Sequence, residues 1–390
     1  MAPLKLKVKP ADFIVEEVAA LPLSKQGAFG AYLLEKEGQN TVELLERISR
    51  KLNLSFADFS YGGRKDRYAL TSQYISIRGG KQPDLKEKDY ALKFIGYMPR
   101  PMGPDLILKN KFTVTVRNLA FAQKAEINTE IEAIKSFGYP NYFDQQRFGS
   151  FDPRQGFLAE KVLKGEFNGA LKIYLTSIYP TDKKAEKERK GFFFSRWRDW
   201  PACLKKAQNP QERTAFSFLA GNPNGFLKLL RQIPAHELST FISAYQSFLW
   251  NEILRRLLKD RIGNSMYACK GLAGDYLFYR NIALADYEYL KGLLIPVPGP
   301  KAKAEDARVE SIYAEVLADN RIKPPMFNKF KLRQSFFRTF YRSAIVVPQD
   351  LAFSFTEDEL YPHKARLLLE FSLPRGSFAT LLAKRIFIDK

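Results

Sequence analysis

Histidine and cysteine are both scarce in this 390-residue chain, which contains two of each. His236 and His363 leave little material for a histidine-based catalytic triad or a zinc cluster. Cys203 and Cys269 lie far apart, with neither a Cys-x-x-Cys pair nor a neighbouring histidine, so we expect buried fillers and no metal site. The His-x-Glu and Pro-Cys-x-x-Cys ligands of a zinc deaminase are also missing.

Nucleotide-binding and membrane-spanning signals are missing too. No Gly-x-x-x-x-Gly-Lys loop or Gly-x-Gly-x-x-Gly turn follows a predicted strand, which argues against a nucleotide-dependent enzyme. No run approaches the roughly 18 apolar residues of a spanning helix, and residues 1–7 lack a hydrophobic signal core. We therefore expect a cytoplasmic protein without a membrane partner, and a monomer, because no coiled-coil pattern is present.

Positive charge is abundant. Lys and Arg number 62 against 42 for Asp and Glu, which gives a formal net charge of +20 and a sequence pI near 9.7. Such an excess indicates a polyanionic partner, with nucleic acid the first choice and an acidic membrane the second. The hydrophobic content of 45% excludes a disordered chain, and the length favours two domains.

The stretch from Arg321 to Arg342 combines seven basic residues, six aromatic residues and no acidic residue. Cations neutralise phosphates while exposed rings stack on unpaired bases, so this stretch is a candidate RNA-binding segment. Its predicted RNA contacts are Lys331, Arg333 and Arg338. In the alternative interpretation Phe336, Phe337 and Phe340 belong to the core and only the cations are exposed.

Apolar periodicity predicts a mixed α/β fold. A helix is expected after the opening box that begins at Asn40, and a second along Phe241, Tyr245, Leu249, Ile253 and Leu257, which recur every four residues. Gln246 and Asn251 lie off that stripe and are candidates for contacts. Strands are expected at residues 74–77, 106–108, 112–117, 345–348 and 366–371.

The most informative stretch runs from Gly62 to Gln73, where Asp66 lies among Arg64, Lys65 and Arg67 directly after a glycine pair. The three cations favour an ionised carboxylate, and an anionic aspartate in a pocket can act as a nucleophile. The glycines permit backbone conformations closed to other residues. The alternative is a surface loop whose charges are only solvated.

Five ordered segments resemble the TruD family of pseudouridine synthases, which isomerise uridine within RNA. Residues 63–73 match the family's Gly-x-Lys-Asp-x-x-x-x-Thr-x-Gln pattern, and residues 140–149 match its Asn-Tyr-Phe-Gly-x-Gln-Arg-Phe-Gly segment, with Asp144 where glycine is usual. The other three matches lie near Lys7 to Glu17, at residues 244–251 and at residues 373–380. Together they extend over nearly the whole chain in the family's order.

The resemblance implies an α/β (α+β) architecture in two domains. A mixed, largely antiparallel pseudouridine-synthase sheet with helices would form a discontinuous catalytic domain from residues 1–154 and 336–390. An α/β TRUD-type domain would be inserted at residues 155–335. The implied partner is RNA, most simply tRNA modified at uridine 13, and the isomerisation would need no cofactor.

The resemblance also assigns roles to individual residues. Asp66 would be the nucleophile, attacking either the ribose C1′ or the uracil C6. The remaining assignments are base binding by Phe143 and Asn141, support from Lys7, Lys65 and Gln73, and RNA binding by Arg147, Arg64 and Arg67. Core packing is the alternative for Phe143, and a purely structural role is the alternative for Arg147.

Two other functional classes remain open on the sequence. A non-catalytic RNA-binding or RNA-chaperone protein on the same scaffold would explain the charge and the aromatics, but not the residues around Asp66. A phosphate-binding structural or ribosome-associated protein would bind with steep salt dependence and without preference for a uridine context.

Overall fold

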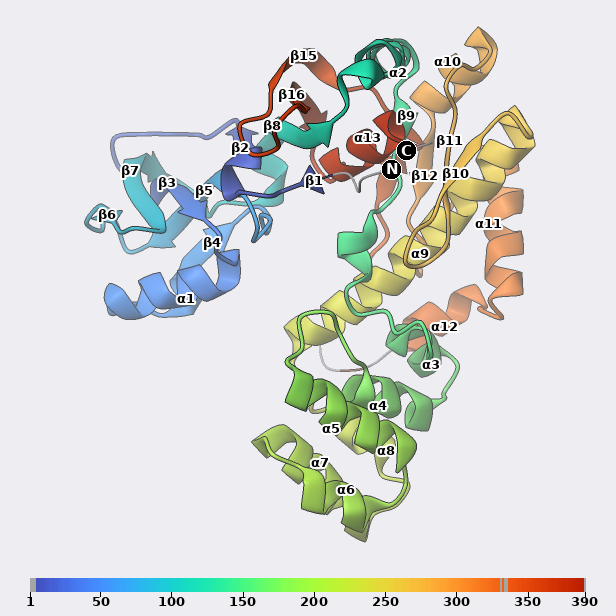
Figure 1. Ribbon diagram of the computed structural model, residues 1–390. Helices are drawn as coiled ribbons and strands as arrows, with labels where there is room; N and C mark the ends of the chain where they lie inside the picture. The colour runs from blue at the N-terminus through green and yellow to red at the C-terminus, as the bar shows by residue number, and fades with distance from the viewer. Residues whose placement is uncertain (1–4, 330–331, 333–335, 389–390) are drawn as a thin grey trace. The chain divides into compact units, whose positions relative to one another are not determined.

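A computed structural model describes residues 5–329, 332 and 336–388. The chain forms two compact units, one from Met1–Tyr139 with Val346–Lys390 and the other from Pro140–Ile345 (Figure 1). The domain boundaries predicted from the sequence, after residue 154 and before residue 336, both fall inside the second unit. The segment from Asn141 to Arg147 therefore belongs to the inserted unit of the structure.

The first unit is built on one large sheet with strand order β15-β16-β8-β2-β5-β3-β7-β6, in which β1 also pairs with β8 and β4 with β5. Only the β2–β5 pair is parallel among the pairings of this sheet within the described residues. Its strands are β1 (Lys5–Leu6), β2 (Phe13–Ala19), β3 (Phe29–Glu37), β4 (Phe59–Tyr61), β5 (Leu70–Arg78), β6 (Leu85–Lys86), β7 (Tyr90–Met98), β8 (Ile107–Leu119), β15 (Gln349–Glu357) and β16 (Ala365–Pro374). The expected mixed fold with a largely antiparallel sheet is confirmed.

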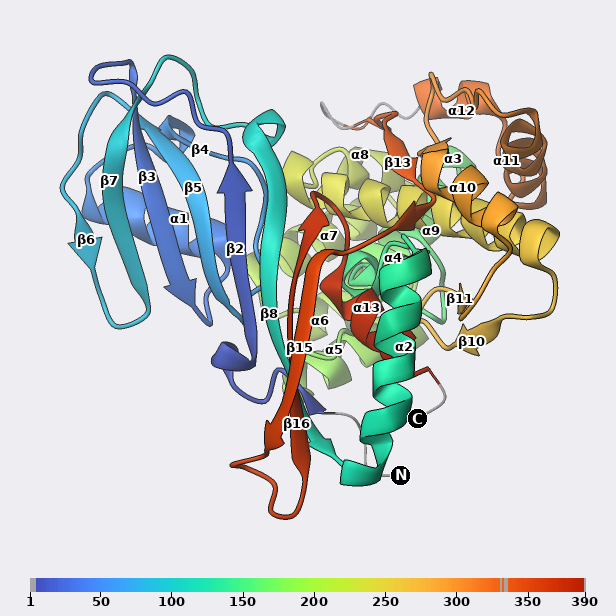
Figure 2. The same cartoon turned by 90° about the horizontal axis from the view of Figure 1, so that it is seen from above.

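Three helices accompany this sheet: α1 (Thr41–Lys51), α2 (Lys124–Phe137) and α13 (Ala379–Ile386). Helix α1 starts where predicted, because the Asn40 side chain accepts a hydrogen bond from the Val42 backbone N–H at 2.9 Å. Its apolar stripe packs on one face of the strands, and Figure 2 shows α1 crossing behind β3, β5 and β7. This cluster contains Leu44, Leu45, Ile48, Tyr32, Leu34, Ile75, Ile77 and Leu92.

A buried guanidinium joins three distant parts of the first unit. Arg117, on β8 and 3% exposed, donates to both carboxylate oxygens of Asp12 at 3.0 Å and to Asp358 at 3.0 Å. The hydrogen bonds that Arg117 donates to Asp12 raise the pKa of Arg117, and Asn118 N–H also donates to Asp358. The network fastens the segment before β2 and the turn after β15 to the centre of the sheet.

The second unit is mainly helical and contains the 28-residue helix α9 (Ala235–Ile262). Its other helices are α3 (Leu158–Leu163), α4 (Phe167–Thr176), α5 (Lys184–Ser195), α6 (Trp200–Lys206), α7 (Pro210–Gly221), α8 (Phe226–Leu230), α10 (Leu284–Gly292), α11 (Ala307–Asp319) and α12 (Pro324–Lys329). Its strands are β10 (Tyr267–Cys269), β11 (Tyr276–Phe278), β12 (Leu294–Pro296) and β13 (Tyr341–Ser343), whereas β9 (Tyr139–Pro140) and β14 (Ile345–Val346) straddle the unit boundaries.

The predicted stripe on α9 is confirmed, since Phe241, Tyr245, Leu249, Ile253 and Leu257 are all buried. The prediction of one strand at residues 345–348 was wrong. Strand β14 ends at Val346 and β15 begins only at Gln349, an interruption that fits Pro348, which has no N–H to donate to a ladder. The strand expected from Leu106 begins one residue later, because Leu106 ends a 3-10 turn.

Cys203 is buried as expected, whereas Cys269 is only partly buried and lies on β10. Among the residues that the structure describes, no helix combines the length and apolar character needed to cross a membrane.

Replacing Arg117 by glutamine should destabilise the protein by about 3 to 5 kcal/mol, because two buried carboxylates lose their cation. The free energy of unfolding in urea measures this cost. Lys111→Gln, on the same strand but exposed, is the matched control and should stay within about 0.5 kcal/mol of wild type. Equal stability of the two variants would contradict a central role for the network.

Candidate active site around Asp66

Asp66 lies in the loop between β4 and β5 of the first unit, and its side chain is 17% exposed. One carboxylate oxygen accepts a hydrogen bond from the Tyr68 backbone N–H at 3.0 Å. The other is ion-paired with the ammonium group of Lys7. The structure thus brings the Lys7 ammonium group to the Asp66 carboxylate, and the family resemblance names Lys7 as a supporting residue.

The ammonium group of Lys7 packs on an aromatic ring. Its ammonium group lies 4.1 Å from the ring centroid of Phe13, a buried residue at the start of β2. The backbone of Lys7 has φ of 57°, in the left-handed region that non-glycine residues rarely occupy. Asp12, which is fixed by Arg117, accepts a hydrogen bond from Lys9 N–H and so ties down this segment.

Lys65 turns away from the Asp66 carboxylate and anchors the loop to the sheet. Its ammonium group forms an ion pair with Glu17 on β2 at 2.6 Å and donates to Asn110 on β8 at 2.6 Å. The Glu17 side chain has no exposed surface, and its other oxygen accepts from Tyr74 N–H at 3.1 Å. The expected supporting role of Lys65 thus has a specific form, a buried attachment between loop and strands.

Gln73 supports the same loop through neutral hydrogen bonds. Its amide nitrogen donates to the Gly63 carbonyl at 3.3 Å, and its amide oxygen accepts from the Thr41 hydroxyl at 3.1 Å. The Thr41 oxygen in turn accepts from Lys65 N–H at 3.1 Å. The first residue of α1 and the middle of β5 therefore brace the backbone just before Asp66.

The glycine pair before the loop works differently from the prediction. Neither Gly62 nor Gly63 has a positive φ, so unusual backbone torsions do not explain them. A Cβ on Gly62 would lie only 2.3 Å from Ile107 Cδ1, whereas a Cβ on Gly63 would meet nothing within 4 Å. Close packing against β8 accounts for glycine at the first position.

Lys36, which the sequence analysis did not single out, is buried beside the loop. Its ammonium group donates to the backbone carbonyls of Asp66 at 2.9 Å and of Gln39 at 2.8 Å. Lys36 is 3% exposed, and burial lowers its pKa to about 8, although the charge of Asp66 opposes this shift. The signal was present, because Tyr32, Leu34 and Lys36 alternate along β3 and share the buried face.

Arg64, Arg67 and Tyr68 form the outer surface of the loop, and all three are exposed. Arg67 lies 5.7 Å from the centroid of the Tyr68 ring, which is 60% exposed. An exposed ring next to a cation suits contact with an unpaired base and a phosphate. The two arginines were expected to bind RNA, whereas Tyr68 was missed, although this aromatic residue lies two positions after Asp66.

Asn141 and Phe143 lie in the second unit and are 4% and 3% exposed. The Asn251 side chain on α9 clamps the Phe143 backbone, accepting from its N–H at 2.8 Å and donating to its carbonyl at 2.9 Å. Gln246 similarly donates to the carbonyls of Pro298 and Arg338 at 2.6 Å and 2.9 Å. Gln246 and Asn251 therefore hold backbone segments in place.

Arg342 is the second clamp on this segment. Its guanidinium donates to the Asn141 carbonyl at 2.7 Å, to the Asn141 side-chain oxygen at 2.6 Å and to the Tyr142 carbonyl at 3.0 Å. It also lies 4.2 Å from the Phe143 ring centroid. The Asn141 amide nitrogen donates to the Ser343 carbonyl at 3.2 Å, so the orientation of this amide is fixed.

Asp144, at the position where the family has glycine, adopts φ of −87°, which any residue can occupy. The substitution therefore needs no unusual turn. Arg147 is exposed and lies 5.5 Å from the Phe143 ring centroid.

The basic and aromatic stretch after residue 321 is only partly described. Lys331 and Arg333 lie outside the described residues. Arg338 is exposed and lies 5.7 Å from the ring centroid of Phe336. Phe336 and Phe340 are 54% and 48% exposed, whereas Phe337 is buried, so the prediction that all three belong to the core holds for Phe337 alone.

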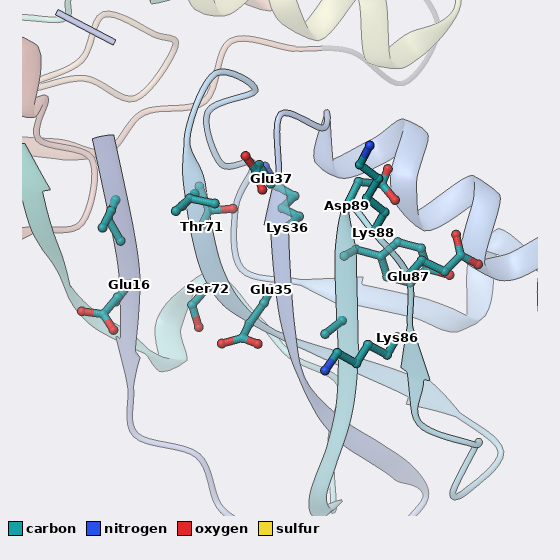
Figure 3. A pocket seen from close by; sticks show the side chains of 14 residues that line it. Glu16, Glu35, Lys36, Glu37, Thr71, Ser72, Lys86, Glu87, Lys88 and Asp89 are labelled. Carbon is teal, nitrogen blue, oxygen red and sulfur yellow. The ribbon is translucent and has the colours of Figure 1, made fainter. Parts of the chain in front are cut away.

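A cavity of about 360 Å³ opens on the first unit's sheet, but neither Asp66 nor Lys7 lines it. Figure 3 shows Glu16, Ser72 and Glu35 side by side on neighbouring strands, as their registers require. Lys36 lines the cavity and also bonds the Asp66 carbonyl. Within the described part of the chain no cluster of three or more His, Cys, Asp or Glu could hold a metal ion.

Comparison with known proteins places this geometry in a class. A family model described as tRNA pseudouridine synthase D (TruD) matches residues 3–386. A protein of Methanococcus maripaludis named a probable tRNA pseudouridine synthase D 1 is 33% identical, with 98% of this chain and 99% of the relative covered. The tRNA pseudouridine synthase D of Leptospira interrogans is 30% identical, with coverage of 98% and 96%.

A crystal structure described as tRNA pseudouridine synthase D (TruD) from Methanosarcina mazei superposes with a TM-score of 0.70 at 27% identity. The superposition covers 98% of this chain and 92% of that one. The fold and these matches define an RNA pseudouridine synthase, which is an isomerase. Within that class the chain belongs to the TruD family, and the resemblance seen in the sequence is confirmed.

Raising the pH from 7 to 10 should stabilise wild type relative to Lys36→Met by about 2 to 3 kcal/mol. In the folded protein the pKa of Lys36 is about 8, whereas in the unfolded chain it has the ordinary value of 10.5. Between these values the unfolded state binds more protons, so stability rises with pH. Urea unfolding at both pH values measures the difference.

The control is Lys93→Met on β7, which removes an exposed ammonium group. Its pH dependence should equal that of wild type. A Lys36→Met protein with the same pH dependence as wild type would show that this lysine is not desolvated.

Proposed function

We propose that this protein isomerises a uridine of tRNA to pseudouridine, with Asp66 as the nucleophile and uridine 13 as the target. The observation that carries the proposal is the Asp66 carboxylate, ion-paired to Lys7 and bonded to Tyr68 N–H, on a loop fixed by buried groups. The names of the relatives support tRNA as substrate. Uridine 13 comes from the family resemblance.

The reaction needs little beyond these groups. The N1–C1′ glycosidic bond breaks, the uracil turns, C5 bonds to C1′, and the proton displaced from C5 is balanced by one gained at N1. An anionic carboxylate can attack C1′ with uracil as leaving group or add to C6 before the bond breaks. Lys7 and the Tyr68 N–H hold the carboxylate in a defined orientation for either route.

The target uridine must leave the RNA stack before it can react, because its glycosidic bond is otherwise inaccessible. We assign base recognition to Asn141 and Phe143. With its oxygen bonded to Arg342 and one amide hydrogen directed at Ser343, Asn141 retains a second amide hydrogen. That hydrogen can donate to a uracil carbonyl.

Contacts with the RNA backbone outside the reacting base are assigned to exposed cations. Arg64, Arg67, Arg147 and Arg338 are all exposed, and each can neutralise a phosphate. Lys65 is only slightly exposed and ion-paired, so its role is to support the loop.

Asp66→Asn should lower pseudouridine formation by roughly 10³-fold or more, because the amide is isosteric but is not a nucleophile. Affinity for tRNA should stay within about threefold. Unmodified tRNA is incubated without added cofactor or metal, and pseudouridine is mapped with a specific chemical tag. A tRNA with cytidine at position 13 is the substrate control.

Activity in Asp66→Asn would refute the nucleophile assignment. Conversion of the cytidine-13 tRNA at another position would refute the target while leaving the reaction intact. Tight binding by wild type with no product from tRNA would favour a binding protein on the same scaffold.

Arg342→Lys should lower the single-turnover rate on the order of 10- to 100-fold with nearly unchanged tRNA affinity. Lysine cannot reproduce the forked donation to the Asn141 carbonyl and side chain, so the amide loses its fixed orientation. The exposed Arg338→Lys makes the same exchange and should remain within about twofold of wild type. Equal rates for both variants would mean that Arg342 does not position Asn141.

A further inference from the structure

Two cations of the second unit converge on a single aromatic ring. Phe194, near the end of α5, has the Lys172 ammonium nitrogen 4.0 Å and the Arg154 guanidinium carbon 4.6 Å from its centroid. Lys172 comes from α4, and Arg154 comes from the loop before α3. Neither residue belongs to the motifs shared with the family. Phe194 and Lys172 are half-buried, whereas Arg154 is exposed.

Arg154 is held in place before any ligand arrives. Its guanidinium contacts the Asp152 carboxylate at 3.3 Å, and its backbone N–H donates to the same carboxylate at 2.8 Å. Gln155 also donates to Asp152 at 2.8 Å, and Gly156 N–H closes the turn on the Asp152 carbonyl at 2.7 Å. Asp152 is buried, which opposes ionisation, but these donors lower its pKa.

Lys172 has no such compensation. Among the described residues it forms no ion pair, and its ammonium group packs on the Phe194 ring. Burial lowers the pKa of Lys172, and the charge of Arg154 lowers it further, so the two cations are close enough to repel each other. Asp152 is paired with Arg154 and not with Lys172, and an added anion would relieve the repulsion between the two cations.

We propose that Arg154 and Lys172, held around Phe194, form a binding site for a phosphodiester group of the RNA backbone. An arginine fork and a lysine point charge together bind a phosphate, and the ring restricts both side chains beforehand. RNA is the favoured source because the chain carries a net charge of +20 and belongs to an RNA-modifying family. The inference rests on the proposed function only for this choice of ligand.

The first test is the salt dependence of tRNA binding, measured by fluorescence anisotropy from 50 to 300 mM salt. Each lost phosphate contact reduces the slope of log K against log salt by about 0.7 to 0.9. Lys172→Gln should show this reduction and, at about 0.1 M salt, roughly sixfold weaker binding. Lys205→Gln, which removes an exposed charge on α6 of the same unit, should match wild type.

The second test does not depend on a variant. Lysines are acylated briefly in the free protein and in the tRNA complex, and the modified sites are quantified by mass spectrometry. Lys172 should be protected by tRNA, whereas Lys205 should react equally in both samples. A slope for Lys172→Gln equal to that of Lys205→Gln, or equal acylation of Lys172 with and without tRNA, would overturn the proposed site.

Pseudouridine formation at saturating enzyme is followed in parallel for wild type and for Lys205→Gln, and the control substitution should leave the rate unchanged. Wild type that forms no pseudouridine while the slope still falls would retain the phosphate site and refute the proposed function. Full activity of wild type, together with a salt slope that Lys172→Gln leaves unchanged, would support the proposed function and refute the phosphate site. The two inferences therefore fail independently.

Discussion

The buried guanidinium of Arg117 is the constraint on which the candidate active site depends. It pairs with Asp12 and Asp358, which come from opposite ends of the chain, and so closes a discontinuous unit around one strand. Charged groups this deeply buried are stable only when every partner is present, which makes the arrangement all-or-none. Lys7 lies five residues before Asp12 on the segment that this network fixes, so the cation opposite Asp66 inherits its position from an interaction elsewhere in the sheet.

The cations near Asp66 fall into two groups, those that bond buried parts of the protein and those that are exposed. Lys65 and Lys36 point inward, to Glu17 and Asn110 and to backbone carbonyls, and hold the loop from below. Lys7 forms an ion pair with the carboxylate, while Arg64 and Arg67 are exposed on the outer surface of the loop. The buried lysines thus hold the loop, and the exposed arginines are available to a ligand.

Sequence pattern was sufficient to predict elements whose formation depends on neighbouring residues. The cap residue Asn40 before α1 and the period of four along α9 predicted helices that the structure contains. Interactions between residues distant in sequence were out of reach. Arg117 and Asp358 are 241 positions apart, and nothing in either neighbourhood indicates the other. Lys36 was missed although it continues the buried alternation of β3, because a polar residue in an amphipathic segment is ordinarily exposed. Asn251 was expected only to make contacts of some kind, and its bonds to the Phe143 backbone, 108 positions away, depend on tertiary packing. The unit boundary after Tyr139 could not be predicted either, because the composition of the sequence does not change where the motif at residues 140–149 begins.

Both units hold their candidate functional residues by backbone clamps from distant side chains. In the first unit Gln73 and Lys36 bond carbonyls at Gly63 and Asp66, and in the second Asn251 and Arg342 bond the main chain from Asn141 to Phe143. Clamping the main chain fixes where a side chain begins while leaving its tip available, which is what a reaction on a flipped base requires. The amide of Asn141 is oriented by contacts of the same kind, with its oxygen bonded to Arg342 and its nitrogen to the Ser343 carbonyl. Polar groups of fixed direction can discriminate between ligands, because a ligand without the matching group leaves a buried donor unpaired.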